Sequence, residues 1–281
     1  MPAQIIDGKM IAQQIKDEIK AKVSALNERG VYPALAVVIA GDDPASHVYV
    51  KNKRIACEYT GIRSSIHTLP GDAAEGDVVD LIEKLNQDPE IHGILVQSPL
   101  PGHLDEEKIQ LRVSQDKDVD CFNPYNIGLV SLGKSRFKPC TPEGVVELLK
   151  RSQIQIEGKH CVVLGRSNIV GKPAAALLLA ENGTMTTCHS KTKDLPGICR
   201  QADILVAAVG KPGFVTADMV KDGAVVIDVG IHRSENNKLR GDVDYDACFA
   251  KAGYITPVPG GVGPMTIAML MMNCLRAGES A

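Results

Sequence analysis

The sequence contains no apolar run of the roughly 18 residues that a membrane-spanning helix requires. Its longest candidate, Met265 to Leu275, is too short and includes the polar Asn273. The N-terminal stretch MPAQIIDGKM does not show the positively charged and then apolar pattern of a secretory signal. We therefore expect a cytoplasmic protein without a membrane partner.

Charge of one sign is not in excess either. The 281 residues include 31 Lys and Arg and 34 Asp and Glu, which gives a formal net charge of −3. Proteins that bind nucleic acid or anionic membranes generally carry a basic surplus, so this balance gives no reason to expect either partner. Hydrophobic residues at 44% and charged residues at 23% are ordinary for a globular chain, and the length allows two modest domains.

The sequence also lacks the common spacings of metal ligands. Its eight cysteines form no CxxC pair and no His/Cys cluster at zinc spacing, and we expect them to be reduced thiols in the core. Asp116, Asp118 and Asp120 alternate, but their segment has neither the Gly nor the Glu that a calcium-binding EF-hand loop requires. We therefore predict no metal site.

What the sequence does contain is a regular alternation of strand-like and helix-like segments. Strands are predicted at 34–40, 62–69, 91–97, 161–164, 184–189, 204–209 and 225–229, and helices at 11–26, 44–60, 76–86, 141–153, 172–182, 194–201 and from about 265. Such alternation is typical of parallel sheets covered by helices on both faces. The stretches 98–107 and 114–128, rich in Pro, Gly, Asp and Asn, are predicted to form loops, with at most one short helix between them.

These segments predict an α/β fold with two α/β domains, each with a parallel sheet. We expect the first domain to comprise residues 1–140 plus 265–281 and the second to comprise 141–264. Thr141 as N-cap, Pro142 in the first turn and Glu143 mark the start of the helix that connects them.

The helix at 44–60 has both of its ends marked in the sequence. Asp43 can accept backbone N–H bonds as the N-cap, Pro44 suits the first turn, and Gly61 suits the left-handed position after the last turn. Because the apolar strand 34–40 leads into it, this helix starts at the carboxyl edge of a sheet, where ligands bind in open α/β folds.

Two residues of this helix suggest chemistry. Tyr49 and Lys53 lie four residues apart and therefore on one face. Positive charge at Lys51 and Arg54 would disfavour protonation of Lys53, and a lysine general base must be neutral. The alternative interpretation is a solvated basic surface of an ordinary helix.

A second candidate site is the turn GRSNIVG, between a strand and a helix. Gly165 and Gly171 bracket the turn as in a dinucleotide site, where backbone N–H groups and the helix dipole meet phosphate. Ser167 stands where the second Gly of GxGxxG would be, so a simple packing turn is the alternative. Gly210 and Gly230, at the ends of later strands, would also allow the backbone to approach a ligand.

The residues after the next strand favour NADP over NAD. An NAD site usually has an acid there for the ribose 2′-hydroxyl, whereas this sequence has Ser190 and Lys191. Together with Arg166, these residues would attract the 2′-phosphate of NADP.

Over nearly its whole length the chain resembles the bifunctional methylenetetrahydrofolate dehydrogenase/cyclohydrolase family. The resemblance is carried by the segments YVKNK (49–53), ILVQSPLP (94–101), KDVD (117–120), PCTPEGV (139–145), GRSNIVGKP (165–173) and PGGVGPMT (259–266). It implies that the first domain and the C-terminal helix bind folate, that the second is a Rossmann-type domain for NADP, and that the active-site cleft lies between them. It also implies a cytoplasmic homodimer of one-carbon metabolism and purine biosynthesis.

The resemblance further implies roles for matching residues. Lys53 would be the central catalytic residue, Gln97 its hydrogen-bonding partner, Tyr49 a substrate-positioning ring, and Asp120 the acceptor for N–H groups of the pterin. The residues that would line the folate site in the loop 259–264 are Pro259, Gly260, Gly261 and Pro264. The residues that we expect to contact the cofactor are Gly165, Arg166, Ser167, Ser190, Lys191, Gly210, Gly230 and Ile231.

Three positions depart from the pattern of the family. Cys121 follows Asp120 where Gly is common, Ser98 replaces a common Leu, and His232 replaces a common Asn. The change at Cys121 concerns the turn that presents Asp120 to folate.

The implied function is NADP-dependent oxidation of 5,10-methylenetetrahydrofolate to the methenyl form and its hydrolysis to 10-formyltetrahydrofolate. One alternative is an enzyme with the dehydrogenase activity alone. Another is a non-catalytic regulatory protein that binds NADP or folate, although such a protein would not need an amine beside a phenol. A dehydrogenase for a different substrate is a further alternative, but we find no His/Asp pair placed for hydroxyl oxidation.

Overall fold

The computed structural model describes residues 2–233 and 238–280, which divide into two compact units. Unit 1 comprises Met1–Ala12 and Thr141–Thr266, and unit 2 comprises Gln13–Cys140 and Ile267–Ala281. The first domain predicted from the sequence corresponds to unit 2, and the second to unit 1. The prediction placed residues 1–12 in the first domain, whereas the structure groups them with unit 1. The reason is that the N-terminal segment adds a short parallel strand to the sheet of unit 1.

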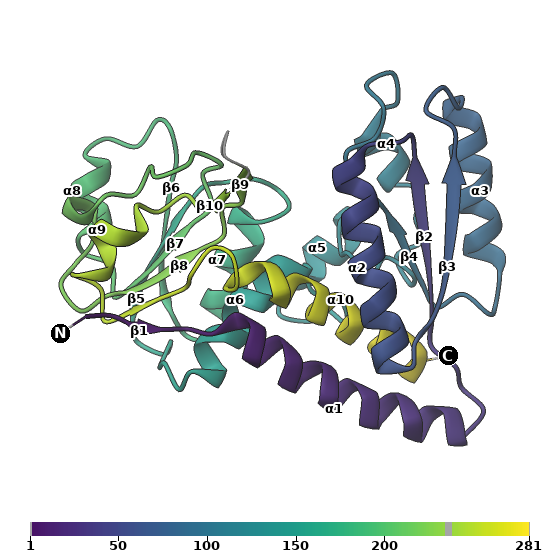
Figure 1. Cartoon of the computed structure of the whole chain (residues 1–281), viewed down its shortest axis with the longest axis horizontal. Helices are drawn as coiled ribbons and strands as arrows, with labels where there is room; N and C mark the ends of the chain where they lie inside the picture. Colours follow the sequence, from purple (N-terminus) through teal and green to yellow (C-terminus); the bar gives the residue numbers. More distant parts are fainter. Residues whose placement is uncertain (1, 234–237, 281) are drawn as a thin grey trace. The chain divides into compact units, whose positions relative to one another are not determined.

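Unit 2 is built on a three-stranded parallel sheet in the order β3-β2-β4. Its elements are β2 (Ala34–Ala40), α2 (Pro44–Thr60), β3 (Arg63–Leu69), α3 (Glu75–Gln87), β4 (Gly93–Val96), α4 (Glu106–Gln110) and α5 (Pro124–Ser131). The central strand β2 is buried along its whole length, as its apolar sequence predicted. Ala36 and Val38 face α3 and α4, while α2 runs along the other side of the sheet (Figure 1).

The ends of α2 confirm the prediction from sequence. The Asp43 carboxylate accepts a hydrogen bond from the Ser46 N–H (2.7 Å), Pro44 is the first helical residue, and Gly61 adopts a left-handed φ of 80°. Because these local interactions involve neighbours in the chain, the sequence alone was sufficient to place both ends.

Two other helix predictions were wrong. Residues 124–131 form α5 rather than a loop, because Asn123 caps the helix by accepting the Tyr125 N–H and Pro124 fits its first turn. The helix α6 begins at Cys140, so Thr141 is not its N-cap. The Thr141 hydroxyl instead forms a hydrogen bond with that of Thr266 (2.9 Å).

Unit 1 contains a six-stranded sheet in the order β1-β11-β8-β7-β5-β6, whose neighbouring strands pair in parallel. Its elements are β1 (Gln4–Ile5), β5 (His160–Leu164), α7 (Gly171–Ala180), β6 (Thr184–Cys188), α8 (Leu195–Cys199), β7 (Ile204–Ala207), η1 (Ala217–Met219), β8 (Val225–Asp228), β9 (His232–Arg233), β10 (Leu239–Arg240), α9 (Tyr245–Phe249) and β11 (Tyr254–Ile255). Three helices are shared or lie at the division: α1 (Gly8–Glu28), α6 (Cys140–Arg151) and α10 (Val262–Glu279).

The order of these strands is that of a Rossmann-type sheet, since β5 lies between β6 and β7 and the connections run outwards from it in both directions. The predicted α/β fold with parallel sheets is therefore confirmed. The two-residue strands β1, β9, β10 and β11 were missed because segments of that length have no readable alternation.

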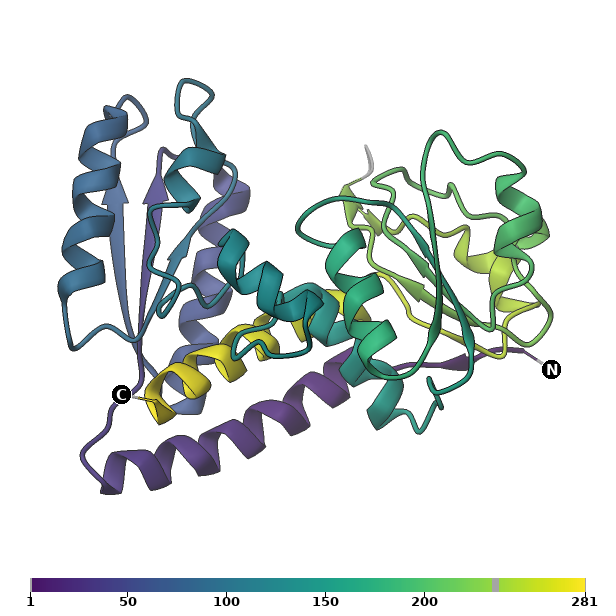
Figure 2. The same ribbon diagram turned by 180° about the vertical axis from the view of Figure 1, so that it is seen from behind.

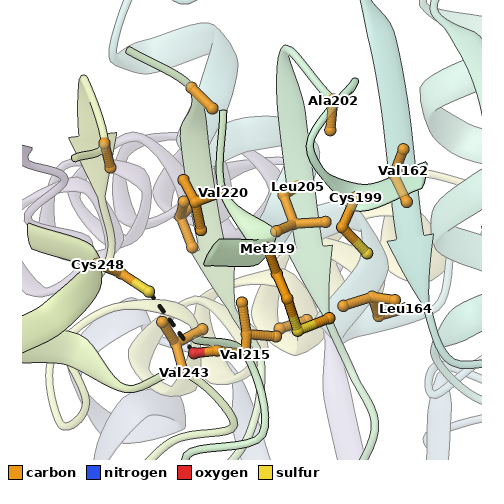
Figure 3. Close-up of a cluster of buried hydrophobic side chains, with 14 of the residues drawn as sticks. Val162, Leu164, Cys199, Ala202, Leu205, Val215, Met219, Val220, Val243 and Cys248 are labelled. Atoms are coloured by element: carbon orange, nitrogen blue, oxygen red, sulfur yellow. Dashed lines mark hydrogen bonds between the residues drawn. The ribbon is translucent and has the colours of Figure 1, made fainter. Parts of the chain in front are cut away.

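One face of this sheet carries a hydrophobic core of unit 1. Val162 and Leu164 of β5 and Leu205 of β7 pack with Met219 of η1 and with residues of α8 and α9 (Figure 3). The helix α7 contacts β5 and β6 from the opposite face (Figure 2). Among the described residues, no helix combines the length and the apolar character of a membrane span.

All eight cysteines are buried, as predicted for core thiols. Burial raises the pKa of Cys57 and Cys199 to about 12 and the pKa of Cys161 and Cys248 to about 11. Because only the thiolate reacts rapidly, we expect the native protein to show almost no reaction with a colorimetric thiol reagent at pH 8, whereas urea should expose all eight thiols. Rapid labelling of the native protein would contradict this expectation.

Candidate functional site

In unit 2 the carboxyl ends of two neighbouring strands define a candidate site. β2 is central and pairs with β3 on one side and β4 on the other, so the chain connections diverge at the ends of β2 and β4. Ligands of open α/β sheets bind at such a point. The helix that follows β2 carries Tyr49 and Lys53, and the residue that follows β4 is Gln97.

Lys53 and Gln97 are in direct contact, although 44 positions separate them. Lys53 Nζ donates a hydrogen bond to Gln97 Oε1 (3.0 Å). The backbone of Gln97 is fixed because its N–H donates to Val38 O (2.8 Å), and the residue is only 8% exposed. The structure thus brings an amine on a helix and an amide at a strand end together.

Asp120 belongs to the same group of side chains. Asp118 forms a parallel bridge with Ile94, which sets Asp120, two residues further on, level with the end of β4. Burial raises the pKa of the Asp120 carboxyl, and the positive charge of Lys53 opposes that rise. The site thus combines an amine that is hydrogen-bonded to a neutral amide with a buried carboxyl that feels the charge of that amine.

Tyr49 lies one helical turn before Lys53, on the same face of α2. Its side chain is 46% exposed, so the ring is available to a flat ligand. Arg54 forms an ion pair with Glu58 (3.5 Å), and its charge is therefore shared with that acid.

The turn that presents Asp120 is held by a buried carboxylate. Asp118 is 4% exposed and accepts hydrogen bonds from the N–H groups of Phe122 (3.1 Å) and Asn123 (2.8 Å) and from the Asn126 amide (2.9 Å). Within this turn Cys121 adopts a φ of 61°. The left-handed conformation expected of a Gly is therefore adopted by the cysteine, at a cost of about 1–2 kcal/mol.

The glycine-rich loop after β11 belongs to unit 1. Gly260 has a φ of 110° and accepts the Lys9 N–H (3.1 Å), and a Cβ at Gly8 would approach Gly261 O to 1.9 Å. The loop therefore lies in backbone contact with the first turn of α1. Gly260 and Gly261 are buried, Pro264 is half-buried, and Pro259 is exposed.

The predicted dinucleotide turn also lies at a divergence point, at the ends of β5 and β7 in unit 1. Gly165 has a φ of 121°, and a Cβ there would meet Ala208 O at 2.1 Å. A Cβ at Gly171 would meet Gly165 O at 2.3 Å. Only glycine fits at these two positions, because any Cβ would collide with a backbone carbonyl oxygen.

Ser167, which stands where GxGxxG would have a glycine, stabilises this turn through its side chain. Its hydroxyl accepts hydrogen bonds from the N–H groups of Val170 and Gly171, each at 3.2 Å. The side chain therefore serves as a cap for the start of α7. A contact between Ser167 and a cofactor stays a prediction.

The residues around this turn fit a dinucleotide with a 2′-phosphate. Arg166 in the turn and Ser190 and Lys191 after β6 are exposed, and residues 189–193 include no acid. An anion placed here would meet positive charge without repulsion from a carboxylate in that stretch.

Asp242 is a residue of this region that the sequence did not reveal. The carboxylate is fully buried and accepts hydrogen bonds from the backbone N–H groups of Val209 (2.6 Å), Gly210 (2.9 Å) and Lys211 (2.9 Å). His232 Nε2 lies 2.7 Å from Asp242 Oδ1. Asp242 thus shapes the segment that follows β7, and a buried acid in an otherwise unmarked loop gives no signal in the sequence.

Asp228 holds the backbone at Asp242 through hydrogen bonds. Its carboxylate accepts the N–H groups of Gly230, Asp242 and Val243, at 2.9–3.0 Å. Burial raises the pKa of Asp228 to about 6. A Cβ at Gly230 would come within 2.5 Å of Asp242, so this glycine is required for packing, and the neighbouring Ile231 is 44% exposed.

Two family models match the chain. The catalytic-domain model of tetrahydrofolate dehydrogenase/cyclohydrolase matches residues 6–120, and the NAD(P)-binding-domain model of the same family matches residues 139–281. These ranges include every residue that we predicted to form part of the sites.

Relatives and solved structures agree with this match. The bifunctional protein FolD of Agathobacter rectalis is 58% identical over 98% of this chain and 99% of its own, and that of Lachnoclostridium phytofermentans is 60% identical over 99% and 98%. The crystal structure of the bifunctional enzyme FolD from Campylobacter jejuni superposes with a TM-score of 0.96 at 47% identity and covers 99% of each chain. A Trypanosoma brucei methylenetetrahydrofolate dehydrogenase-cyclohydrolase complexed with NADP and an inhibitor has a TM-score of 0.94 at 38% identity and covers 100% of this chain and 98% of its own. The resemblance inferred from the sequence is confirmed, and the chain belongs to the tetrahydrofolate dehydrogenase/cyclohydrolase family.

Proposed function

We propose that the chain oxidises 5,10-methylenetetrahydrofolate with NADP⁺ to the 5,10-methenyl form and hydrolyses that product to 10-formyltetrahydrofolate. In this proposal unit 2 binds the folate and unit 1 binds the dinucleotide. The observation that carries the proposal is the contact of Lys53 with Gln97 beside Asp120, in a chain that matches both domain models of the family.

The hydrolytic step needs a base, and Lys53 is the residue that we assign to it. The methenyl group is a cation shared between two nitrogens, and water adds to its carbon only as a proton leaves that water. Lys53 in its neutral form would take this proton, directly or through a second water, and leave a hydroxyl on that carbon. As the hydroxyl loses its proton and the C=O bond forms, the bond from the carbon to N5 breaks, and N5 takes the electron pair and a proton to give the 10-formyl product. Gln97 Oε1 would hold Nζ in place through the observed hydrogen bond.

The other residues of unit 2 would orient the folate. We assign the Asp120 carboxyl to the N–H groups of the pterin and the exposed ring of Tyr49 to contact with the substrate. A contact of folate with Pro259, Gly260, Gly261 and Pro264 stays a prediction, since their loop belongs to unit 1. Orientation is a large contribution here, because a well-placed reactant avoids the entropic cost of collision.

The oxidation step needs binding and alignment rather than an acid or base. NADP⁺, when bound, supplies the hydride acceptor. We assign Gly165, Arg166 and Ser167 to the phosphate-binding turn and Ser190 and Lys191 to the 2′-phosphate. The segment that Asp242 holds, with Gly210, and the strand end at Gly230 and Ile231 complete the assigned cofactor residues.

A single time course tests the proposal. Purified protein is mixed with methylenetetrahydrofolate and NADP⁺, and NADPH, the methenyl form and the 10-formyl product are followed together beside an enzyme-free control. We expect NADPH to form and the 10-formyl product to appear faster than in the control. Accumulation of the methenyl form that decays only at the control rate would show a dehydrogenase without cyclohydrolase activity.

Preference for NADP over NAD should depend on Lys191. A hydrogen bond to a charged group contributes about 1.5–3 kcal/mol, so Lys191→Ala should raise the Kd of NADP⁺ by about tenfold or more. The Kd of NAD⁺, which has no 2′-phosphate, should change little. Lys193→Ala, an exposed lysine two residues further on, is the matched control and should bind both dinucleotides as the wild type does.

We also propose that the protein is a cytoplasmic homodimer that serves one-carbon metabolism and purine biosynthesis, without nucleic-acid or membrane partners. Family membership supports this proposal, and β3 lies at the edge of its sheet, where a second copy could pair. Light scattering during size-exclusion chromatography should give twice the chain mass of 30.0 kDa, and a monomer at micromolar concentration would contradict the dimer.

A further inference from the structure

A chain of hydrogen bonds leads from Lys53 away from the proposed site and ends on α4. Gln97, whose Oε1 accepts from Lys53, donates its Nε2 to Ser98 O (2.5 Å). The amide is therefore held at both of its ends. A glutamine amide presents an acceptor on one side and a donor on the other, and only this orientation places the acceptor towards Lys53.

Ser98, whose carbonyl accepts from Gln97, is in turn held by Glu106 through its hydroxyl. One carboxylate oxygen of Glu106 accepts the Ser98 hydroxyl (2.6 Å), and the other accepts the Leu100 N–H (3.1 Å). The carboxylate thus bridges both ends of the segment 98–100. Gln110 completes the arrangement, since its Nε2 lies 3.2 Å from both Ser98 Oγ and Glu106 Oε1.

The helix that carries Glu106 is itself anchored. Asp105 caps α4 by accepting the Lys108 N–H (3.1 Å), and Ile109 is fully buried in the cluster formed with α3 and β4. The helix lies at the end of the sheet towards which β2 and β3 point (Figure 1). Glu106 therefore ties the segment 98–100, which holds the Gln97 amide, to the packed helix α4.

We propose that Glu106 is a positioning residue for the hydrolysis reaction, acting through Ser98 and Gln97 on the Lys53 amine. This inference rests on the proposed role of Lys53 as the base. Glu106 itself does not touch the substrate. Its bond to Ser98 requires a hydroxyl at position 98, which this chain has in place of the common leucine.

The test compares Glu106→Ala with Glu107→Ala, which removes an exposed acid from the same helical turn. Hydrolysis is measured with methenyltetrahydrofolate as the substrate and oxidation with methylenetetrahydrofolate and NADP⁺. A misplacement of about 1 Å can lower a rate by about 10²-fold, and we expect Glu106→Ala to lower the kcat of hydrolysis by about tenfold or more. The KM for the folate and the rate of oxidation should stay within about twofold of the wild type.

Two further variants separate positioning from general damage to the fold. Ser98→Ala removes the hydroxyl and leaves α4 intact, so it should lower hydrolysis in the same selective way. Glu106→Gln keeps one acceptor and should retain more activity than Glu106→Ala. An equal loss of oxidation and hydrolysis in Ser98→Ala would overturn the inference.

A double-mutant cycle with Gln97 is the decisive readout. If Glu106 acts through Gln97, then Glu106→Ala should have no further effect on hydrolysis in a Gln97→Ala background. Additive losses would show that the route through Gln97 is wrong. Lys53→Met serves as the reference: if it retains full hydrolysis, the proposed role of Lys53 as the base fails. If it abolishes hydrolysis while Glu106→Ala and Ser98→Ala leave hydrolysis unchanged, only the present inference fails.

Discussion

Replacement of Lys53 by methionine is expected to abolish the hydrolysis of methenyltetrahydrofolate and to leave NADP⁺ binding unchanged. Methionine has a similar length and no proton to exchange, so Gln97 would lose its donor and water would lose its base. A positioned general base contributes about 10²–10⁴-fold to a rate, and a loss of at least about 10²-fold should therefore be seen. The dinucleotide should bind as before because its assigned residues all belong to unit 1.

The measurement is the initial rate of methenyltetrahydrofolate decay above the spontaneous rate, together with a fluorescence titration of NADPH. Lys84→Met is the matched control, since Lys84 is exposed on α3 of the same unit. The control should hydrolyse at the wild-type rate. A Lys53→Met protein with full cyclohydrolase activity would contradict the assignment of the base.

The contrast between Lys53 and its partner shows what sequence could and could not provide. The helix that carries Lys53 was predicted with both ends correct, because Asp43, Pro44 and Gly61 act on neighbouring residues. The contact with Gln97 joins two segments 44 residues apart and exists because β2 and β4 are adjacent in the sheet. Periodicity gives the elements, whereas the order of strands decides which of their ends meet.

The departures from the family pattern make the same point. Sequence indicated that Cys121, Ser98 and His232 differ, but not what each side chain does. In the structure Cys121 adopts the left-handed backbone, Ser98 bonds to Glu106, and His232 bonds to Asp242. Each outcome depends on a partner or a backbone angle set by tertiary packing, and local propensity carries no information about it.

The acid cluster of unit 1 was missed for a similar reason. Asp242 lies in the segment between β10 and α9, where turn residues are common, and surface acids are far more frequent than buried ones. Its three backbone donors at 209–211 belong to a different loop. Only the sheet that brings the end of β7 beside the segment after β10 reveals that the carboxylate is structural.

Asp242→Ala should cause one of the largest losses of stability in unit 1. The substitution removes the acceptor of three backbone N–H groups and of His232 at once, and each donor left without a partner in a buried setting costs about 1–3 kcal/mol. Since part of the 209–211 segment is accessible to water, we expect a total loss of at least about 3 kcal/mol rather than the full sum. Urea denaturation followed by circular dichroism should show this as a lower midpoint.

The same substitution separates a structural role from a role in binding. Asp246→Ala removes an exposed acid four residues later and should leave the urea midpoint unchanged. If Asp242 orders the segment after β7 for the dinucleotide, the NADP⁺ affinity of Asp242→Ala should also fall at a temperature where the variant is still folded. Unchanged affinity with lowered stability would restrict Asp242 to the fold. Unchanged stability would mean that water replaces the carboxylate at all three N–H groups, and the burial seen here argues against that outcome.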